Sequence, residues 1–125
     1  MRAGPELDQL NYMEDWELAV HAALERKAID PTVLDIGRVS TFTEQFVICH
    51  GTNSRQVQAI ADSIHAGLKS EGRLPLHIEG YERAEWVLLD YGDFVAHVFA
   101  KDKRYYYDLE RLWRTAPRLP VPVAA

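Results

Sequence analysis

The stretch from residue 46 to residue 72 constrains the fold more than any other part of the chain. Residues 46–49 form a short, continuously apolar run, which is typical of a strand in the interior of a sheet. A polar turn follows, where Asn53 together with Gln56, or Ser54 alone, can cap a helix. Gly72 stands where a glycine ends a helix. Between these ends, apolar side chains recur with helical spacing at Val57, Ile60, Ala61, Ile64 and Leu68.

The remaining patterns predict more helices and strands of the same domain. Asn11 and Glu14 fit a capping box, so a helix is expected from there to about residue 27, where Asp30-Pro31 forbids its continuation. Strands are expected at residues 33–36, 76–79 and 86–90, and residues 94–99 complete a hairpin with the last of these. After a charged break at residues 101–103, a final helix is expected at 104–113, with inward-facing Tyr106, Leu109, Leu112 and Trp113. This order predicts an α/β fold with a single mixed sheet of about five strands flanked by helices.

The length of 125 residues suits one domain with an apolar core of its own. We expect residues 1–10 to be a flexible leader, residues 11–116 to form the domain, and residues 117–125 to be a proline-rich extended tail. No run approaches the roughly 20 apolar residues that span a bilayer, and the N-terminus lacks the apolar core of a signal peptide. The expected location is therefore the cytoplasm.

The charge balance narrows the expected partners. The formal net charge is −5, so the chain as a whole gains little from releasing the counterions of a nucleic acid. An acidic chain is better suited to a basic protein surface. We therefore expect a protein partner, with little direct contact to RNA and none to DNA or a membrane.

No residue pattern predicts an enzyme, a metal site or a cofactor. The histidines show no i, i+4 pair, and Cys49, the one cysteine, falls in the apolar strand, where a buried thiol is expected. The turn at 51–54 resembles the glycine-serine turn of nucleotidyltransferases. Those enzymes need two nearby carboxylates for magnesium, whereas here Asp62 follows alone. The later carboxylates could pair in space, although a solvated or partner-facing acidic patch explains them better: Glu79, Asp90, Asp93, Asp108 and Glu110.

Aromatic side chains are dense between residues 79 and 113. A domain of this size cannot bury all of them, and exposed tyrosine and tryptophan are typical anchors of protein interfaces. The pattern favours a binding surface built from the hairpin and the final helix. The rings concerned are Tyr81, Trp86, Tyr91, Phe94, Phe99, Tyr105, Tyr106, Tyr107 and Trp113.

An ordered series of motifs between residues 33 and 117 resembles a known family. It comprises F-V-I at 46–48 with G-T-N-S-R at 51–55, A-I-A-D at 59–62, E-G at 79–80, W-V-L-L-D-Y-G-D at 86–93, H-V-F at 97–99, Arg104, and Y-D-L-E-R-L-W at 107–113. Together these are similar to the Iojap family, the bacterial ribosomal silencing factors. The chain departs from the family where T-D-Y often precedes F-V-I, since residues 43–45 are Thr-Glu-Gln, and also at His50 and Asn53.

The resemblance implies a nucleotidyltransferase-like fold without catalytic residues. It also implies binding to the large ribosomal subunit through its ribosomal protein fourteen, steric blocking of small-subunit joining, repression of translation, and a part in large-subunit biogenesis. Trp86 would be the apolar anchor, and the three carboxylates of the set would pair with basic side chains of the partner. The partner-facing residues carried over are Glu79, Trp86, Asp90, His97, Phe99, Arg104, Tyr107 and Glu110.

Two alternatives remain open at this point. A degenerate nucleotidyltransferase would bind a nucleoside triphosphate and magnesium at residues 51–55. A self-associating module would instead use the aromatic surface to form a homodimer.

Overall fold

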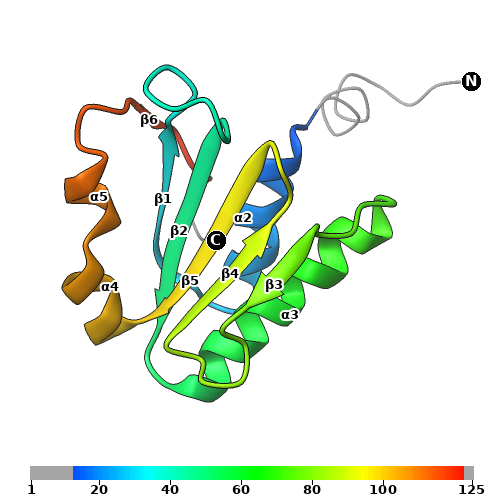
Figure 1. Cartoon of the computed structure of the whole chain (residues 1–125). Helices are drawn as coiled ribbons and strands as arrows, with labels where there is room; N and C mark the ends of the chain where they lie inside the picture. Colours follow the sequence, from blue (N-terminus) through cyan, green and yellow to red (C-terminus); the bar gives the residue numbers. More distant parts are fainter. Residues whose placement is uncertain (1–12, 123–125) are drawn as a thin grey trace, which may run out of the picture.

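The computed structural model describes residues 13–122, which form one six-stranded mixed sheet with helices on both faces (Figure 1). The strand order is β3-β4-β5-β2-β1-β6; β2 and β5 run parallel, and every other neighbouring pair is antiparallel. The strands are β1 (Ile29–Asp35), β2 (Gln45–Gly51), β3 (His77–Glu79), β4 (Trp86–Asp90), β5 (Phe94–Ala100) and β6 (Arg118–Leu119), and the helices are α2 (Asp15–Glu25), α3 (Ser54–Ser70), α4 (Lys101–Tyr107) and α5 (Leu109–Leu112). The predicted α/β class and single mixed sheet are confirmed.

The strand–turn–helix unit predicted at residues 46–72 is present as β2 and α3. The Asn53 side chain accepts a hydrogen bond from the Gln56 amide at 2.8 Å, which caps α3. Gly72, at φ +82°, follows the helix and lets the Arg73 amide reach back to the Leu68 carbonyl. The apolar stripe of α3 is buried, together with one side of α2, against one face of the sheet. No helix within residues 13–122 is long and apolar enough to cross a bilayer.

The central strands explain why the sequence shows continuous apolar runs. Helices cover both faces of the sheet, so β2 and β5 are buried almost throughout. Cys49 in β2 is completely buried, and desolvation raises the pKa of its thiol to about 12, which fits the expected structural role.

The first helix and first strand differ from the predicted bounds. Glu14 caps α2 in a capping box with Glu17, whereas the predicted cap Asn11 lies outside the described residues. The helix ends at Glu25, and β1 begins at Ile29, so that Asp30 and Pro31 lie within the strand. Proline is tolerated there because the pairing with β2 is irregular between Ile29 and Thr32.

The predicted helix at 104–113 is wrong as a single element. Asp108 has φ +47° and separates α4 from α5, and residues 101–103 form the first turn of α4 instead of a break. This interruption changes the phase of the helical period. Leu109 is buried as expected, but Tyr106 is 78% exposed and Leu112 is 72% exposed. Beyond α5, β6 pairs with β1 inside the segment expected as a tail, which gives the sheet its sixth strand.

Candidate partner-binding face of the sheet

The predicted partner-facing residues of the strands share one face of the sheet. In the antiparallel register, Trp86 lies opposite Phe99, Leu88 opposite His97, and Glu79 opposite Leu88. Asp90 follows Trp86 at two-residue steps along β4, and directly paired or alternate residues point to the same face. Val87 and Leu89 point the other way, into the core beneath α2 and α3. The five predicted strand residues therefore gather on the face that α4 and α5 partly cover.

The other three predicted residues reach this face from α4 and α5. The Tyr107 ring lies 4.7 Å from the Trp86 ring, centroid to centroid. Arg104 and Glu110 form an ion pair of 2.7 Å at the opposite end of the same layer, beside β1 and β2. All eight residues thus belong to one side of the molecule.

Accessibility divides the eight residues into two groups. Three of the predicted residues are buried: His97 is 3% exposed, Phe99 0% and Arg104 3%. The prediction that their side chains face a partner is therefore corrected: they support the exposed residues of this face from beneath. The Glu110 side chain is mostly buried against Arg104 and belongs with them. The remaining four form what we call the partner face: Glu79, Trp86, Asp90 and Tyr107.

Sequence reasoning missed two members of this surface. Leu88 is half-buried between Trp86 and Asp90 on the same side of β4. His77 Nε2 lies 3.0 Å from a carboxylate oxygen of Glu79 and 3.7 Å from one of Asp90. Alternate residues of a strand point to the same face, so both residues could have been predicted once the exposed side of β4 was known.

Trp86 is held in place from below. Its indole Nε1 donates a hydrogen bond to His97 Nδ1 at 3.0 Å, and its ring stacks on buried Phe99 at 5.0 Å. Because His97 Nδ1 accepts this bond, the neutral imidazole carries its proton on Nε2, which has no hydrogen-bond partner among the described residues. The neighbouring Phe46 ring packs edge-to-face with the imidazole at 4.5 Å. The tryptophan therefore sits on a rigid, apolar base.

Burial of His97 predicts a pH dependence of stability. Desolvation lowers the pKa of His97 to about 3, whereas the unfolded chain titrates near 6.5. Between these values the unfolded state binds a proton that the folded state does not, so the free energy of unfolding falls by about 1.4 kcal/mol per pH unit on acidification. We expect His97→Asn, which keeps an acceptor but cannot titrate, to flatten this decline in urea titrations from pH 6 to pH 4. Identical slopes in the variant and the parent would contradict the assignment.

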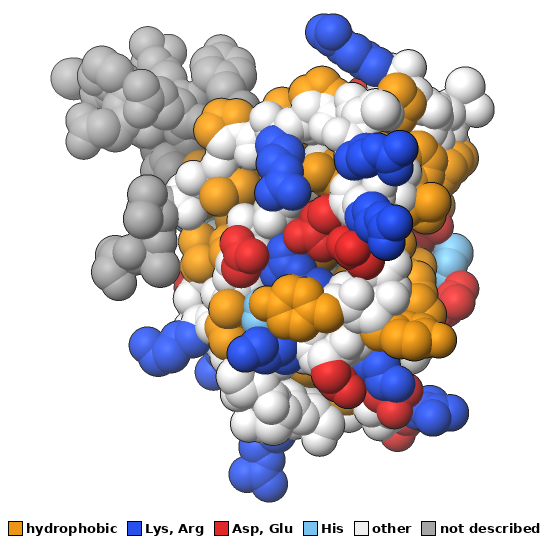
Figure 2. Space-filling view, turned by 90° about the vertical axis from the view of Figure 1, so that its left-hand side faces the viewer, with side chains coloured by type: hydrophobic (Ala, Val, Ile, Leu, Met, Phe, Trp, Pro, Cys, Tyr) orange, Lys and Arg blue, Asp and Glu red, His pale blue; other side chains and the backbone are white. Residues whose placement is uncertain are grey.

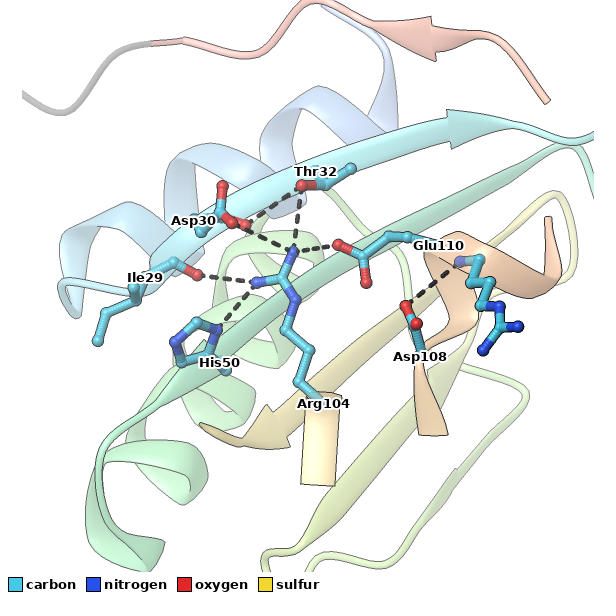
Figure 3. A network of polar contacts seen from close by, with 8 residues as sticks. Ile29, Asp30, Thr32, His50, Arg104, Asp108 and Glu110 are labelled. Carbon is cyan, nitrogen blue, oxygen red and sulfur yellow. Dashed lines mark hydrogen bonds and ion pairs between the residues drawn. The ribbon is translucent and has the colours of Figure 1, made fainter. Parts of the chain in front are cut away.

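Arg104 joins α4 to β1, β2 and α5 (Figure 3). Its guanidinium donates to the Ile29 carbonyl at 3.2 Å and to His50 Nδ1 at 2.9 Å. It also donates to Thr32 Oγ1 at 3.1 Å and to Glu110 Oε2 at 2.7 Å, so a buried cation is neutralised and hydrogen-bonded. Burial and the Arg104 charge both lower the pKa of His50, which keeps that imidazole neutral as an acceptor.

Gly80 fixes how closely the β3–β4 connection approaches Trp86. It has φ +80°, and a Cβ atom there would lie 2.1 Å from the Trp86 carbonyl oxygen. Only glycine combines this backbone conformation with that contact. The turn therefore places Glu79 directly beside the strand that carries the tryptophan.

The five carboxylates considered as a possible acidic patch are dispersed. Glu79 and Asp90 meet at His77, whereas Asp93 binds Arg73. Asp108 caps α5 through the Arg111 amide, and Glu110 pairs with Arg104. The expected acidic surface is thus confined to the β3–β4 end of the face, and Lys and Arg side chains lie among the acidic ones over α4 and α5 (Figure 2).

The glycine turn at the start of α3 is occupied by the protein's own side chains. Gln56 Oε1 accepts from the Thr52 amide at 2.8 Å, and Gln56 Nε2 donates to the carbonyls of Arg26 and Lys27. The Asn53 side chain accepts a hydrogen bond from the Gln56 amide. These backbone amides are already paired, so the turn is a capped helix start that also ties α3 to the end of α2.

Comparison with known proteins identifies the family. The family described as "Ribosomal silencing factor during starvation" matches residues 10–124. This chain belongs to it. The ribosomal silencing factor RsfS of Halalkalibacterium halodurans is 46% identical over 101 residues, which cover 81% of this chain and 86% of that protein. A crystal structure of protein CV0518 from Chromobacterium violaceum superposes with a TM-score of 0.77 at 36% identity, covering 90% of this chain and 97% of that one.

A more distant relative is the mouse protein named "Mitochondrial assembly of ribosomal large subunit protein 1", which is 28% identical over 116 residues. The aligned residues cover 90% of this chain and 50% of the mouse protein. Membership of the ribosomal silencing factor family assigns this chain a role in ribosome-associated silencing of translation.

Proposed function

We propose that this silencing factor binds the large ribosomal subunit through its ribosomal protein fourteen and sterically prevents the small subunit from joining. The family membership and the name of the mouse relative support the large subunit as the target. The named ribosomal protein follows from the motif resemblance of residues 46–113. A role in large-subunit biogenesis is compatible with the same contact.

The observation that carries this proposal is the partner face. Trp86 is half-buried and Tyr107 is 46% exposed, so two adjoining rings present apolar surface to solvent. Glu79 and Asp90 add acceptors at their margin. Aromatic anchors bordered by charges are typical of protein interfaces, and the rigid support of Trp86 limits the entropy lost on binding.

We expect Trp86→Ala to weaken binding to ribosomal protein fourteen more than Glu79→Ala does. Truncation of a buried interface anchor costs about 2 kcal/mol or more, which is roughly a thirtyfold increase in Kd. An exposed charge at the margin contributes about 0–1 kcal/mol. Calorimetric titration of the purified partner measures both values.

Tyr81→Ala is the matched control for Trp86→Ala. Tyr81 is also a half-buried ring, but it packs against the core beneath α2 and α3 and donates to Asp62. Its loss is expected to leave the Kd for ribosomal protein fourteen within about twofold of the parent. Equal losses for Trp86→Ala and Tyr81→Ala would contradict the assignment of the partner face.

The blocking of subunit joining requires a separate measurement. We expect the chain to sediment with purified large subunits and to reduce the fraction of joined ribosomes when small subunits are added. Trp86→Ala is expected to lose both effects together. Co-sedimentation without any reduction in joining would support binding and contradict the steric mechanism.

A further inference from the structure

Positive charge is concentrated on α4, α5 and the turn that follows, although the chain as a whole carries −5. Lys101, Arg111 and Arg114 are exposed, and Lys103 is half-exposed. Within residues 13–122, none of these four cations forms an ion pair with a carboxylate, whereas Arg104 is neutralised beneath them. The same side of the molecule shows Lys and Arg side chains dispersed around small acidic groups (Figure 2).

Exposed rings lie among these cations. Tyr105 is 65% exposed and Tyr106 is 78% exposed, which is unusual for side chains of this size. The Lys103 ammonium lies 5.9 Å from the Tyr106 ring centroid, and Tyr106 meets Tyr107 edge-to-face at 5.0 Å. An open groove of about 300 Å³ is lined by two rings, two cations, one carboxylate and one apolar side chain: Tyr106, Tyr107, Arg111, Arg114, Asp108 and Leu112.

We propose that this α4–α5 surface binds ribosomal RNA beside the protein contact made by the partner face. Lys101, Arg111 and Arg114 neutralise backbone phosphates, and Tyr105 and Tyr106 stack on unpaired bases. Cations that follow a backbone, combined with rings on which any base can stack, are the usual means of binding single-stranded nucleic acid. An acidic protein segment would satisfy the cations but would leave the two most exposed tyrosines without a role.

This inference rests on the proposed function, because it assumes the large subunit as the target. It also revises the expectation of little RNA contact, which was based on net charge. Electrostatic attraction to phosphate depends on the local arrangement of charge, and over residues 101–114 five basic side chains outnumber three acidic ones.

A salt titration with two targets tests the inference. The triple variant Lys101→Gln, Arg111→Gln, Arg114→Gln removes three cations from the surface. The control triple Arg55→Gln, Lys69→Gln, Arg83→Gln removes three exposed cations from elsewhere and gives the same net charge. Kd is measured for intact large subunits and for isolated ribosomal protein fourteen at several KCl concentrations.

We expect the surface triple to weaken binding to intact subunits about tenfold at low salt and to reduce the slope of log K against log salt by about two. Its Kd for isolated ribosomal protein fourteen should stay within about twofold, and the control triple should resemble the parent on both targets. Equal weakening on the isolated protein would assign the cations to an acidic protein surface and overturn the proposal. An unchanged slope on intact subunits would overturn it as well.

Failure of the proposed function has a different signature, since the parent chain would then not bind isolated ribosomal protein fourteen at all.

The stacking part of the inference is tested with a double variant. Tyr105→Ala, Tyr106→Ala is expected to weaken subunit binding about tenfold, whereas Tyr105→Phe, Tyr106→Phe retains the affinity because stacking needs no hydroxyl. Equal affinities of the alanine and phenylalanine variants would contradict stacking.

Discussion

Arg104→Met is expected to lower the free energy of unfolding by about 3–5 kcal/mol, as measured by urea denaturation. Methionine fills much of the space of the arginine stem but cannot donate. Its introduction leaves Glu110 partly buried without its cation and removes the donors to Thr32 Oγ1 and His50 Nδ1. Unpaired buried polar groups of this kind are among the most costly consequences of a single substitution.

Arg111→Met is the control, because it makes the same chemical change at an exposed position of α5. It should alter stability by no more than about 0.5 kcal/mol. In a double-mutant cycle with Glu110→Met, we expect a coupling energy between Arg104 and Glu110 of about 1–3 kcal/mol. Additive losses, or equal losses for Arg104→Met and Arg111→Met, would contradict the role of Arg104 as the link between α4 and the sheet.

Phe99→Ala is expected to cost about 3–5 kcal/mol of stability through the loss of buried apolar contact and the cavity left behind. Phe99 is fully buried and stacks beneath Trp86, so its removal also loosens the base of the partner face. The milder Phe99→Leu keeps the chain folded and should cost about 1–2 kcal/mol. We expect it to weaken binding to ribosomal protein fourteen by about fivefold.

Phe94 provides a matched control for Phe99. It is also fully buried on β5, but it points to the opposite face, where it stacks with Tyr91 beside Arg73. Phe94→Leu should lose similar stability without changing the Kd for the partner. Equal effects of the two leucine variants on Kd would mean that binding follows overall stability instead of the support beneath Trp86.

Periodicity along the chain was sufficient to predict the elements whose neighbours are also close in sequence. The Asn53 cap, the buried stripe of α3 and the glycine after it all depend on residues within a few positions of one another. The hairpin of β4 and β5 was predictable for the same reason, since a short turn joins its strands. Motif order between residues 33 and 117 was sufficient for the family, which the comparisons confirm.

Accessibility of the candidate site residues was not predictable from the same patterns. Arg104 belongs to a residue type that is almost never buried alone, and only the meeting of β1, β2 and α5 supplies its partners. Phe99 and Tyr106 belong to the same aromatic run, yet one is fully buried and the other is 78% exposed. Phe99 belongs to the buried strand β5, whereas Tyr106 lies on α4, which begins where β5 ends and leaves one side in solvent.

The amino-acid order thus determined the fold class, because element type depends on local spacing and hydrophobic pattern. Its ordered motifs determined the family, and the resemblance to that family implied the residues that converge on one side of the sheet. Only the tertiary structure decided which of those residues are exposed to solvent and which are buried beneath the exposed ones. It also decided which cations over α4 and α5 stay unpaired: Glu110 neutralises Arg104, whereas Lys101, Arg111 and Arg114 form no ion pair within residues 13–122. Burial and the pairing of charges arise between segments distant in sequence, as when Arg104 of α4 reaches Thr32 of β1, and no local pattern records such contacts.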